Sequence, residues 1–302
     1  MMNSRILAFV LAGGEGRRLH PLTLGTPKPA VELRRGLPIV DFVLSNLVNS
    51  GVPWIYLLMH YKPGPLLEHI SRVWLPALAR RGCTLRPLCP EGPEGAYRGT
   101  ADAVYRHLDL VAQHDPYAVA VFAADHVYRM DLRPMALFHH RRAADITVAA
   151  VPVPLEEAER FGVIDADHDG RIGKFQEKPA QPASIAGDPA RALASMGNYL
   201  FDPTALCELL EELAGHGGTD FGHDALPLAV QSGMRVFAYD FSHHHVPGLK
   251  PYEEANYWRD IGTPGALAEA RHDLDGPTPR FDLRNPRWPL QPARSRIQRH
   301  LY

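Results

Sequence analysis

The sequence has few of the features that mark secreted or membrane-spanning proteins. Its 302 residues include only three cysteines, Cys83, Cys89 and Cys207, and no C-x-x-C pair. This excludes a dense disulfide framework and favours a reducing compartment, so we expect a cytoplasmic protein. The first residues do not resemble a signal peptide, and no apolar run is long enough to cross a bilayer.

The chain also has little net charge and no internal repeat. A formal charge of −2 gives no general attraction to nucleic acid or to an anionic membrane, and we expect neither as a partner. Basic residues must therefore act locally. Hydrophobic residues make up 45% of the chain, which is enough for a substantial core.

Apolar patterns predict alternating strands and helices in the first half of the chain. Apolar runs predict strands, and helical spacing of apolar residues predicts the helices between them. The predicted strands are 6–11, 54–59, 84–88 and 117–124, and the predicted helices are 39–49, 65–80 and 100–111. This alternation predicts an α/β fold with a mostly parallel sheet flanked by helices. A predicted hairpin over 162–177 makes the sheet mixed.

The chain ends in a segment with a different composition. From Gly276 onward, proline and arginine recur without periodicity. We therefore expect one domain over residues 1–275 and a linker or tail over 276–302.

A glycine-rich loop with two arginines follows the first predicted strand, and it reads GGEGRR at 13–18. Glycines let backbone N–H groups approach phosphate oxygens, and arginines neutralise their charge. Leu19 stands where a dinucleotide fingerprint needs its third glycine, and no Walker A ending follows. Lys28, between two prolines, adds a further cation. The loop predicts a polyphosphate site, with an ordinary strand-to-helix turn as the alternative.

Two aspartates are candidates for a metal site. Asp125 follows the strand over 117–124, and the carboxyl ends of parallel strands meet at one edge of a sheet. A carboxylate there can hold Mg²⁺, which prefers oxygen ligands. Asp260, just before a Gly-Thr-Pro turn, is the second candidate. The alternative for Asp125 alone is a helix N-cap.

The pattern GGEGRRLHPLT followed by PKPAV resembles the signature of the sugar-phosphate nucleotidyltransferases, also called nucleoside-diphosphate-sugar pyrophosphorylases. Further stretches narrow the resemblance to the ADP-glucose pyrophosphorylase family. These stretches are IVDFVLSNLVNSG (39–51), YRGTADAVYRHLDL (97–110), DHVY (125–128), VPVPLEEAERFGVI (151–164), FQEKPAQP (175–182), LASMGNYLF (193–201), DFGHDALP (220–227) and YWRDIGTPGAL (257–267). The resemblance spans about residues 5 to 290.

The resemblance implies a Rossmann-like, GT-A-like nucleotidyltransferase domain. It also implies a left-handed β-helix after that domain, which assists tetramer assembly in the family. This chain stops at Tyr302, about where that module would begin, and is either naturally short or a fragment. We expect a homo-oligomer, but without the β-helix we do not expect it to be a tetramer.

The reaction implied is adenylyl transfer from ATP to glucose 1-phosphate, which yields ADP-glucose for glycogen or α-glucan synthesis. The attacking phosphate oxygen is already anionic, so catalysis should rest on positioning and charge neutralisation. We assign Arg18 to the β- and γ-phosphates and Lys28 to the α-phosphate. Asp125 and Asp260 would hold Mg²⁺.

The remaining site residues follow from the resemblance. Residues expected to contact the nucleotide are Leu11, Gly13, Gly14, Gly16, Arg17, Tyr97, Gly99 and Thr100. For Arg17, an exposed surface position is the alternative. Residues expected to contact the sugar phosphate are Gly162, Glu177, Lys178, Ser195 and Trp258. The Glu177 carboxylate can accept hydrogen bonds from sugar hydroxyls, and Lys178 can pair with the phosphate; an exposed ion pair of little energy is the alternative.

Departures from the family pattern leave other functions open. The run over 86–96 lacks the family's P-A-Q-Q-R, and His60 stands where glutamine is usual. Another nucleoside triphosphate or hexose 1-phosphate is therefore an alternative, as is a weakly catalytic regulatory paralogue. The histidine clusters at 139–140 and 243–245 lack metal-ligand spacing, and we expect them to be surface runs.

Overall fold

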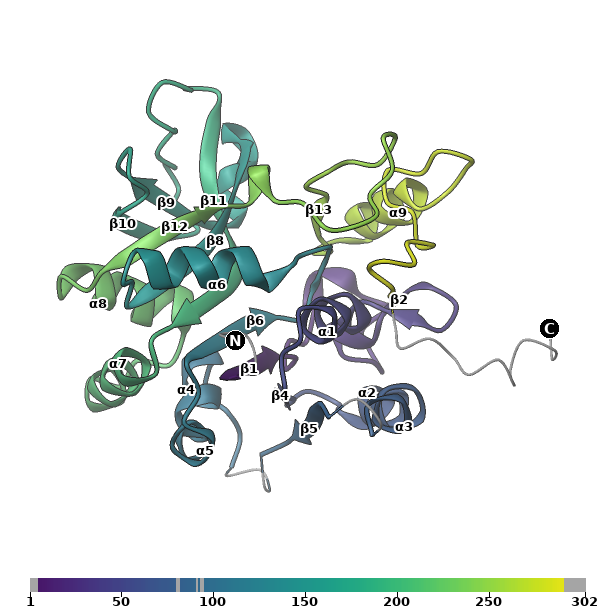
Figure 1. Ribbon diagram of the computed structural model, residues 1–302, viewed down its shortest axis with the longest axis horizontal. Helices are drawn as coiled ribbons and strands as arrows, with labels where there is room; N and C mark the ends of the chain where they lie inside the picture. The colour runs from purple at the N-terminus through teal and green to yellow at the C-terminus, as the bar shows by residue number, and fades with distance from the viewer. Residues whose placement is uncertain (1–4, 80–81, 91, 93–94, 291–302) are drawn as a thin grey trace. The chain divides into compact units, whose positions relative to one another are not determined.

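The computed structural model describes residues 5–79, 82–90, 92 and 95–290, and the chain folds into two compact units (Figure 1). The first unit comprises residues 1–9, 95–122 and 133–243, and the second comprises residues 10–94, 123–132 and 244–302. The chain passes from one unit to the other within two strands, β1 (Ile6–Leu11) and β6 (Ala118–Ala123).

Six strands form the sheet of the first unit together with the start of β1. The order β10-β9-β11-β6 continues to β1, and β8 pairs with both β11 and β12. The bounds are β8 (Ile146–Pro154), β9 (Gly162–Ala166), β10 (Ile172–Glu177), β11 (Arg191–Phe201) and β12 (Val236–Asp240). Strand β11 is antiparallel to its neighbours, whereas β12 runs parallel to β8. The β11 register shifts between Ser195 and Tyr199, where Gly197 has φ +69°.

Helices cover both faces of this sheet. On one face, Phe138 of α6 packs edge-on against Phe237 and Tyr239 of β12. On the other face, Phe221 packs against Tyr199 and Phe201 of β11. The helical elements of this unit are α4 (Thr100–Tyr105), α5 (Leu108–His114), α6 (Leu132–Arg141), η5 (Leu155–Arg160), α7 (Pro203–Gly215), η6 (Phe221–Ala225), α8 (Leu226–Gln231) and η7 (Phe241–His243).

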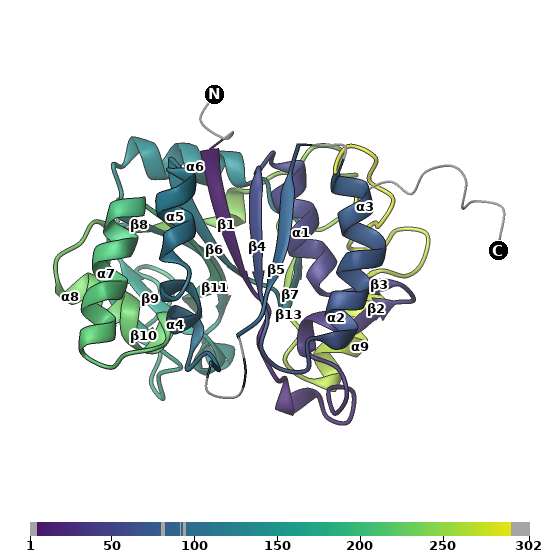
Figure 2. The same cartoon turned by 90° about the horizontal axis from the view of Figure 1, so that it is seen from below.

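The second unit combines the end of β1 with parallel strands and two small antiparallel pairs (Figure 2). Its strands are β2 (Glu32–Arg34), β3 (Leu37–Pro38), β4 (Trp54–Leu58), β5 (Thr84–Leu88), β7 (His126–Tyr128) and β13 (Trp258–Asp260). Its helical elements are η2 (Arg17–Leu19), η3 (Lys28–Ala30), α1 (Val40–Asn49), α2 (Gly64–His69), η4 (Ile70–Trp74), α3 (Leu75–Leu78) and α9 (Pro264–Asp273). The predicted mixed, mostly parallel sheet flanked by helices is confirmed.

The single helix expected over 65–80 is interrupted. A π-helical turn, η4, separates α2 from α3, and Pro76 stands in the first turn of α3. Because proline has no N–H and its ring crowds the preceding turn, it cannot continue a regular α-helical hydrogen-bond ladder. The apolar stripe continues through the interruption, with Leu66, Ile70 and Trp74 all buried.

Residues 276–290 pack onto the second unit despite their aperiodic composition. Phe281 belongs to a buried cluster with Phe42 and Tyr257. The indole N–H of Trp288 donates a hydrogen bond to the side-chain oxygen of Asn46 at 3.1 Å. The domain boundary after residue 275 stays a prediction, and residues 291–302 lie outside the described residues. Among the described helices, none has the length and apolar character that a membrane crossing requires.

Candidate active site

The glycine-rich loop of the second unit folds back onto the segment that carries Lys28. Gly16 has φ +68°, and a Cβ there would lie 2.9 Å from the Cβ of Lys28. The Thr23 hydroxyl donates to the Gly16 carbonyl at 2.8 Å. The Lys28 N–H donates to the carbonyl of Gly14 at 3.4 Å. Glycine is therefore required at position 16 by both conformation and space.

The strand before this loop is also held by backbone hydrogen bonds. The N–H of Ala124 donates to the carbonyl of Leu11 at 3.1 Å, which joins the ends of β1 and β6. A Cβ on Gly13 would lie 3.2 Å from the Cβ of His60, whereas one on Gly14 would meet nothing within 4 Å. The backbone of Gly14 is thus open to approach by another molecule.

Lys28 joins two carboxylates that are far apart in the sequence. Its ammonium donates to Oδ2 of Asp125 at 2.8 Å and to Oδ1 of Asp260 at 3.2 Å. Pairing of β7 with β13 brings these aspartates together, because Asp260 stands opposite His126. Burial by itself would lower the pKa of Lys28, but the two carboxylates outweigh it and raise that pKa. Lys28 is therefore a charged group in a largely buried position.

A group of three potential metal ligands surrounds this ammonium. One donor atom each from Asp125, His126 and Asp260 lies within 4.8 Å of the others. Oδ1 of Asp125 is buried and accepts no hydrogen bond. Burial opposes ionisation of Asp125, but the charges of His126 and Lys28 outweigh it and lower its pKa. A pair of carboxylates with an unused oxygen fits a divalent cation.

His126 is a member of this group that sequence reasoning did not single out. Its ring lies against that of Trp258, with 5.2 Å between the centroids, and its Nε2 is 3.4 Å from Oδ1 of Asp125. The available signal was its position directly after Asp125. The sequence alone does not show that β7 turns this side chain toward the two aspartates.

The two arginines of the loop differ in their surroundings. An ideal Cβ built on Gly262 would lie 3.1 Å from Nη2 of Arg18 and 2.9 Å from Oδ2 of Asp260. The side chains of Arg18 and Asp260 therefore both lie next to Gly262. Arg17 instead pairs with Glu15 at 2.7 Å, and 80% of its side chain is exposed. The structure thus places Arg18, but not Arg17, beside the carboxylate group.

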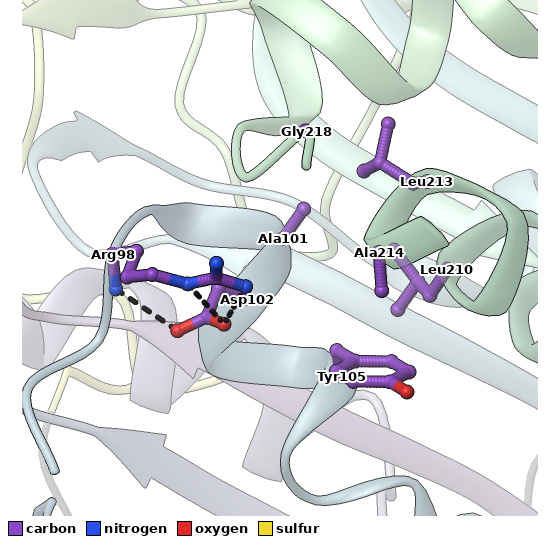
Figure 3. Close-up of a pocket in the computed structure, with 8 residues that line it drawn as sticks. All are labelled: Arg98, Ala101, Asp102, Tyr105, Leu210, Leu213, Ala214 and Gly218. Carbon is purple, nitrogen blue, oxygen red and sulfur yellow. Dashed lines mark hydrogen bonds and ion pairs between the residues drawn. The ribbon is translucent and has the colours of Figure 1, made fainter. Parts of the chain in front are cut away.

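In the first unit, the residues expected to contact the nucleotide are tied to the start of α4. The Asp102 carboxylate accepts the backbone N–H of Arg98 at 2.9 Å and also its guanidinium, as Figure 3 shows. The Tyr97 hydroxyl is 2.7 Å from Nε2 of His107. A cavity of about 10 Å³ between α4 and α7 is only large enough for about one water molecule.

Gly99 and Thr100 contact residues 219–221 in this structure. A Cβ on Gly99 would lie 2.4 Å from the carbonyl oxygen of Thr219, and that oxygen accepts the N–H of Ala101 at 2.8 Å. The Thr100 hydroxyl donates to Oδ2 of Asp220 at 2.9 Å and accepts the N–H of Phe221 at 3.0 Å. Their nucleotide contacts stay predictions.

Four of the five residues expected to contact the sugar phosphate belong to the first unit. Glu177 ends β10 opposite Gly162, and the Lys178 ammonium contacts its Oε1. Lys178 has φ +45°, and 52% of its side chain is exposed. The Ser195 hydroxyl accepts the N–H of Gly197 at 3.2 Å. The fifth residue, Trp258, belongs to the second unit.

The histidine clusters are not entirely on the surface, contrary to expectation. His139 is buried on α6 with Nδ1 at 2.8 Å from the Thr147 hydroxyl, and His244 is buried with Nε2 accepting the N–H of Asp131 at 2.7 Å. Burial lowers the pKa of both histidines to about 4. On the helix α6, His139 faces inward and His140 faces outward. Over residues 243–245 burial alternates, so His244 alone faces inward. Neither belongs to a potential metal group in the described part of the chain.

Comparison with known proteins identifies the family. A family model described as nucleotidyl transferase matches residues 7–276. Among curated relatives named glucose-1-phosphate adenylyltransferase, that of Thermus thermophilus is 47% identical over 97% of this chain and 72% of its own length. That of Thermodesulfovibrio yellowstonii is 45% identical over 96% of this chain and 71% of its own length. That of Mycobacterium leprae is 44% identical over 95% of this chain and 71% of its own length. The chain therefore belongs to the nucleotidyl transferase family and, within it, to the family of glucose-1-phosphate adenylyltransferases.

Proposed function

We propose that this chain transfers the adenylyl group of ATP to glucose 1-phosphate, releasing pyrophosphate and forming ADP-glucose for glycogen or α-glucan synthesis. The names of its relatives support the two substrates. The observation that carries the proposal is the charged group of the second unit, in which Lys28 bridges Asp125 and Asp260 beside Arg18. Such a group can bind a polyphosphate and a divalent cation together.

In the proposed reaction, a phosphate oxygen of glucose 1-phosphate attacks the α-phosphorus of ATP. The bond from that phosphorus to the bridging oxygen breaks, and pyrophosphate leaves with the electron pair. No strong base is needed, because the attacking oxygen carries a negative charge. The chain must instead neutralise charge, with Lys28 at the α-phosphate and Arg18 at the departing β- and γ-phosphates.

We assign the divalent cation to Asp125 and Asp260, and we propose Mg²⁺ because both ligands are hard carboxylates. When bound, the cation supplies charge neutralisation for phosphate oxygens. His126 stands beside the two carboxylates, but its imidazole nitrogen is not a ligand that Mg²⁺ prefers, so we assign the cation to the aspartates alone. The chain's own contribution is to hold the two carboxylates together through the β7–β13 pairing.

We assign the sugar phosphate to Gly162, Glu177, Lys178, Ser195 and Trp258. The Glu177 carboxylate would accept hydrogen bonds from sugar hydroxyls, and the exposed Lys178 ammonium would pair with the phosphate. The nucleotide is assigned to the glycine-rich loop, with Leu11, Gly13, Gly14, Gly16 and Arg17, and to Tyr97, Gly99 and Thr100.

We also propose that the chain acts in the cytoplasm and forms a homo-oligomer. The compartment is supported by its three cysteines, all of which are free thiols. The oligomeric state can be measured by light scattering of the purified chain.

The decisive test of the function is pyrophosphate release by the purified chain with Mg²⁺ and glucose 1-phosphate. ATP, dTTP, UTP and GTP are compared side by side. Release with ATP at a far higher kcat/KM than with the others is the expected result. Preference for another nucleotide would contradict the adenylyl assignment but keep the mechanism. No release with any nucleotide would favour the regulatory paralogue.

A further inference from the structure

Two glycines of the first unit leave space for the carboxylate of Glu177. An ideal Cβ on Gly162 would lie 3.0 Å from Oε2 of Glu177, and one on Gly222 would lie only 2.5 Å from the same oxygen. Real Cβ atoms do not come as close as 2.5 Å to another non-bonded heavy atom, and 3.0 Å is tighter than most real Cβ contacts. The other oxygen, Oε1, is contacted by the Lys178 ammonium. The carboxylate is therefore held between a cation and two residues without side chains.

Gly222 is itself held firmly in place. It lies in the first turn of η6, where Oδ1 of Asp220 accepts its N–H at 2.8 Å and that of His223 at 3.0 Å. The Thr100 hydroxyl donates to the other oxygen of Asp220 at 2.9 Å. Because the backbone of Gly222 is anchored on this side, it cannot readily move away from Glu177.

We propose that Gly222 is a positioning residue for the sugar phosphate, because its missing side chain sets where the Glu177 carboxylate lies. The inference rests on the proposed function, which gives Glu177 the sugar hydroxyls. Gly222 touches no substrate in this proposal and acts only through Glu177. Any side chain at position 222 would displace the carboxylate and weaken its hydrogen bonds to the sugar.

The atoms around Gly222 distinguish it from Gly99 and Gly162, two other crowded glycines of the unit. A Cβ on Gly99 would meet the backbone carbonyl of Thr219, and one on Gly162 would meet the ring of Phe175 at 2.5 Å. At Gly222 the atoms under 3.0 Å are Oε2 and Cδ of Glu177, the far end of a flexible side chain. Alanine at 222 should therefore move Glu177 and leave the fold unchanged.

The test is the variant Gly222→Ala, with Gly215→Ala as its matched control. Gly215 ends α7 in the same unit, and a Cβ there would meet nothing within 4 Å. Because a misplacement of about 1 Å can cost on the order of 100-fold, we expect the KM for glucose 1-phosphate to rise about tenfold or more in Gly222→Ala. The KM for ATP and the melting temperature should match those of Gly215→Ala.

A double-mutant cycle with Glu177→Ala separates positioning from a general structural effect. If Gly222 acts only through the carboxylate, adding Gly222→Ala to Glu177→Ala should change the KM for glucose 1-phosphate no further. An equal, additive rise in both backgrounds would overturn the inference, as would equal rises in the KM for ATP and for the sugar phosphate.

A crystal structure of Gly222→Ala keeps this test independent of the proposed function. Displacement of the Glu177 carboxylate from its position beside residue 222 is the expected result, whether or not the enzyme turns over. An unmoved carboxylate would overturn the inference even in an active enzyme. Absence of ADP-glucose synthesis by the wild-type chain would instead contradict the proposed function.

Discussion

The two units of the molecule position their candidate site residues by different means. In the second unit, Lys28, Asp125 and Asp260 are brought together as opposite charges in a largely buried group. In the first unit, Gly99, Gly162 and Gly222 let backbone and side chains approach closely without such a group. The comparison teaches that one unit gathers charged side chains from distant parts of the chain, whereas the other makes room for close contacts by omitting side chains. In the proposed function, the charged group would take the phosphates of ATP and the cation, and the first unit would contribute Glu177 and Lys178 to the sugar phosphate.

Asp125→Asn should have the largest effect, because it removes one charge from the carboxylate pair while preserving shape. We expect kcat to fall by about 10³-fold or more, since charge neutralisation supplies most of the rate enhancement. Pyrophosphate release measures it, and the melting temperature confirms that the variant folds. Near-normal turnover would remove Asp125 from the metal site.

Lys28→Met tests the cation of the same group. Without the ammonium, two neighbouring carboxylates would repel each other, and the α-phosphate would lose the partner that we propose for it. We expect kcat to fall about 10²- to 10³-fold, in the range seen when one electrostatic stabiliser is removed. Arg35→Ala, which removes an exposed cation of the same unit, is the matched control and should retain activity. Equal losses in both variants would show a nonspecific charge effect.

Lys178→Ala should affect the first unit more selectively. The expected outcome is an increase of about 10- to 100-fold in the KM for glucose 1-phosphate, because a charge-assisted hydrogen bond to phosphate contributes about 1.5–3 kcal/mol. The KM for ATP should change little. A parallel rise in both constants would refute a sugar-phosphate role for this residue.

Acid should weaken both units through their buried histidines, His139 in the first and His244 in the second. Burial lowers the pKa of each in the folded state to about 4 from its ordinary value of 6.5, so the unfolded chain binds protons first as the pH falls. The free energy of unfolding should therefore decline between about pH 6.5 and pH 4, and the complete loss should be about 3 kcal/mol for each histidine. Urea unfolding across this range measures the decline.

Substitution of each buried histidine separates the two contributions. His139→Gln and His244→Gln should each reduce the pH dependence between pH 6.5 and 4, because the substituted side chain no longer titrates. His168→Gln, at a histidine side chain that is 90% exposed, is the control and should leave the slope unchanged. An unchanged slope in both buried variants would contradict the assignment.

Much of the fold was predictable because its strands are continuous apolar runs. The run ending before Asp125 and the run before the glycine-rich loop are both observed as strands, and their ends are joined by a hydrogen bond. The segment over 276–290 was not predictable, because its buried aromatics Phe281 and Trp288 are spaced without period. Packing of such a segment depends on partners elsewhere in the chain.

The candidate site, like the fold, was predictable from the sequence only in part. Charged residues in a motif, such as Lys28 and Asp125, were identified as candidates from the sequence. Gly222 and Gly262 were not, because their importance lies in what a Cβ would meet in three dimensions. His126 was missed for a related reason, since strand pairing rather than sequence spacing brings it to Asp260.

The bridge made by Lys28 has a consequence for how the protein is made. Its partners lie 97 and 232 residues farther along the chain. During synthesis from the N-terminus, Lys28 and Asp125 are available long before Asp260 leaves the ribosome. The charged group therefore cannot be completed until almost all of the described chain has emerged. A ribosome stalled between the codons for Asp125 and Asp260 would hold a nascent chain with the glycine-rich loop but only one member of the carboxylate pair.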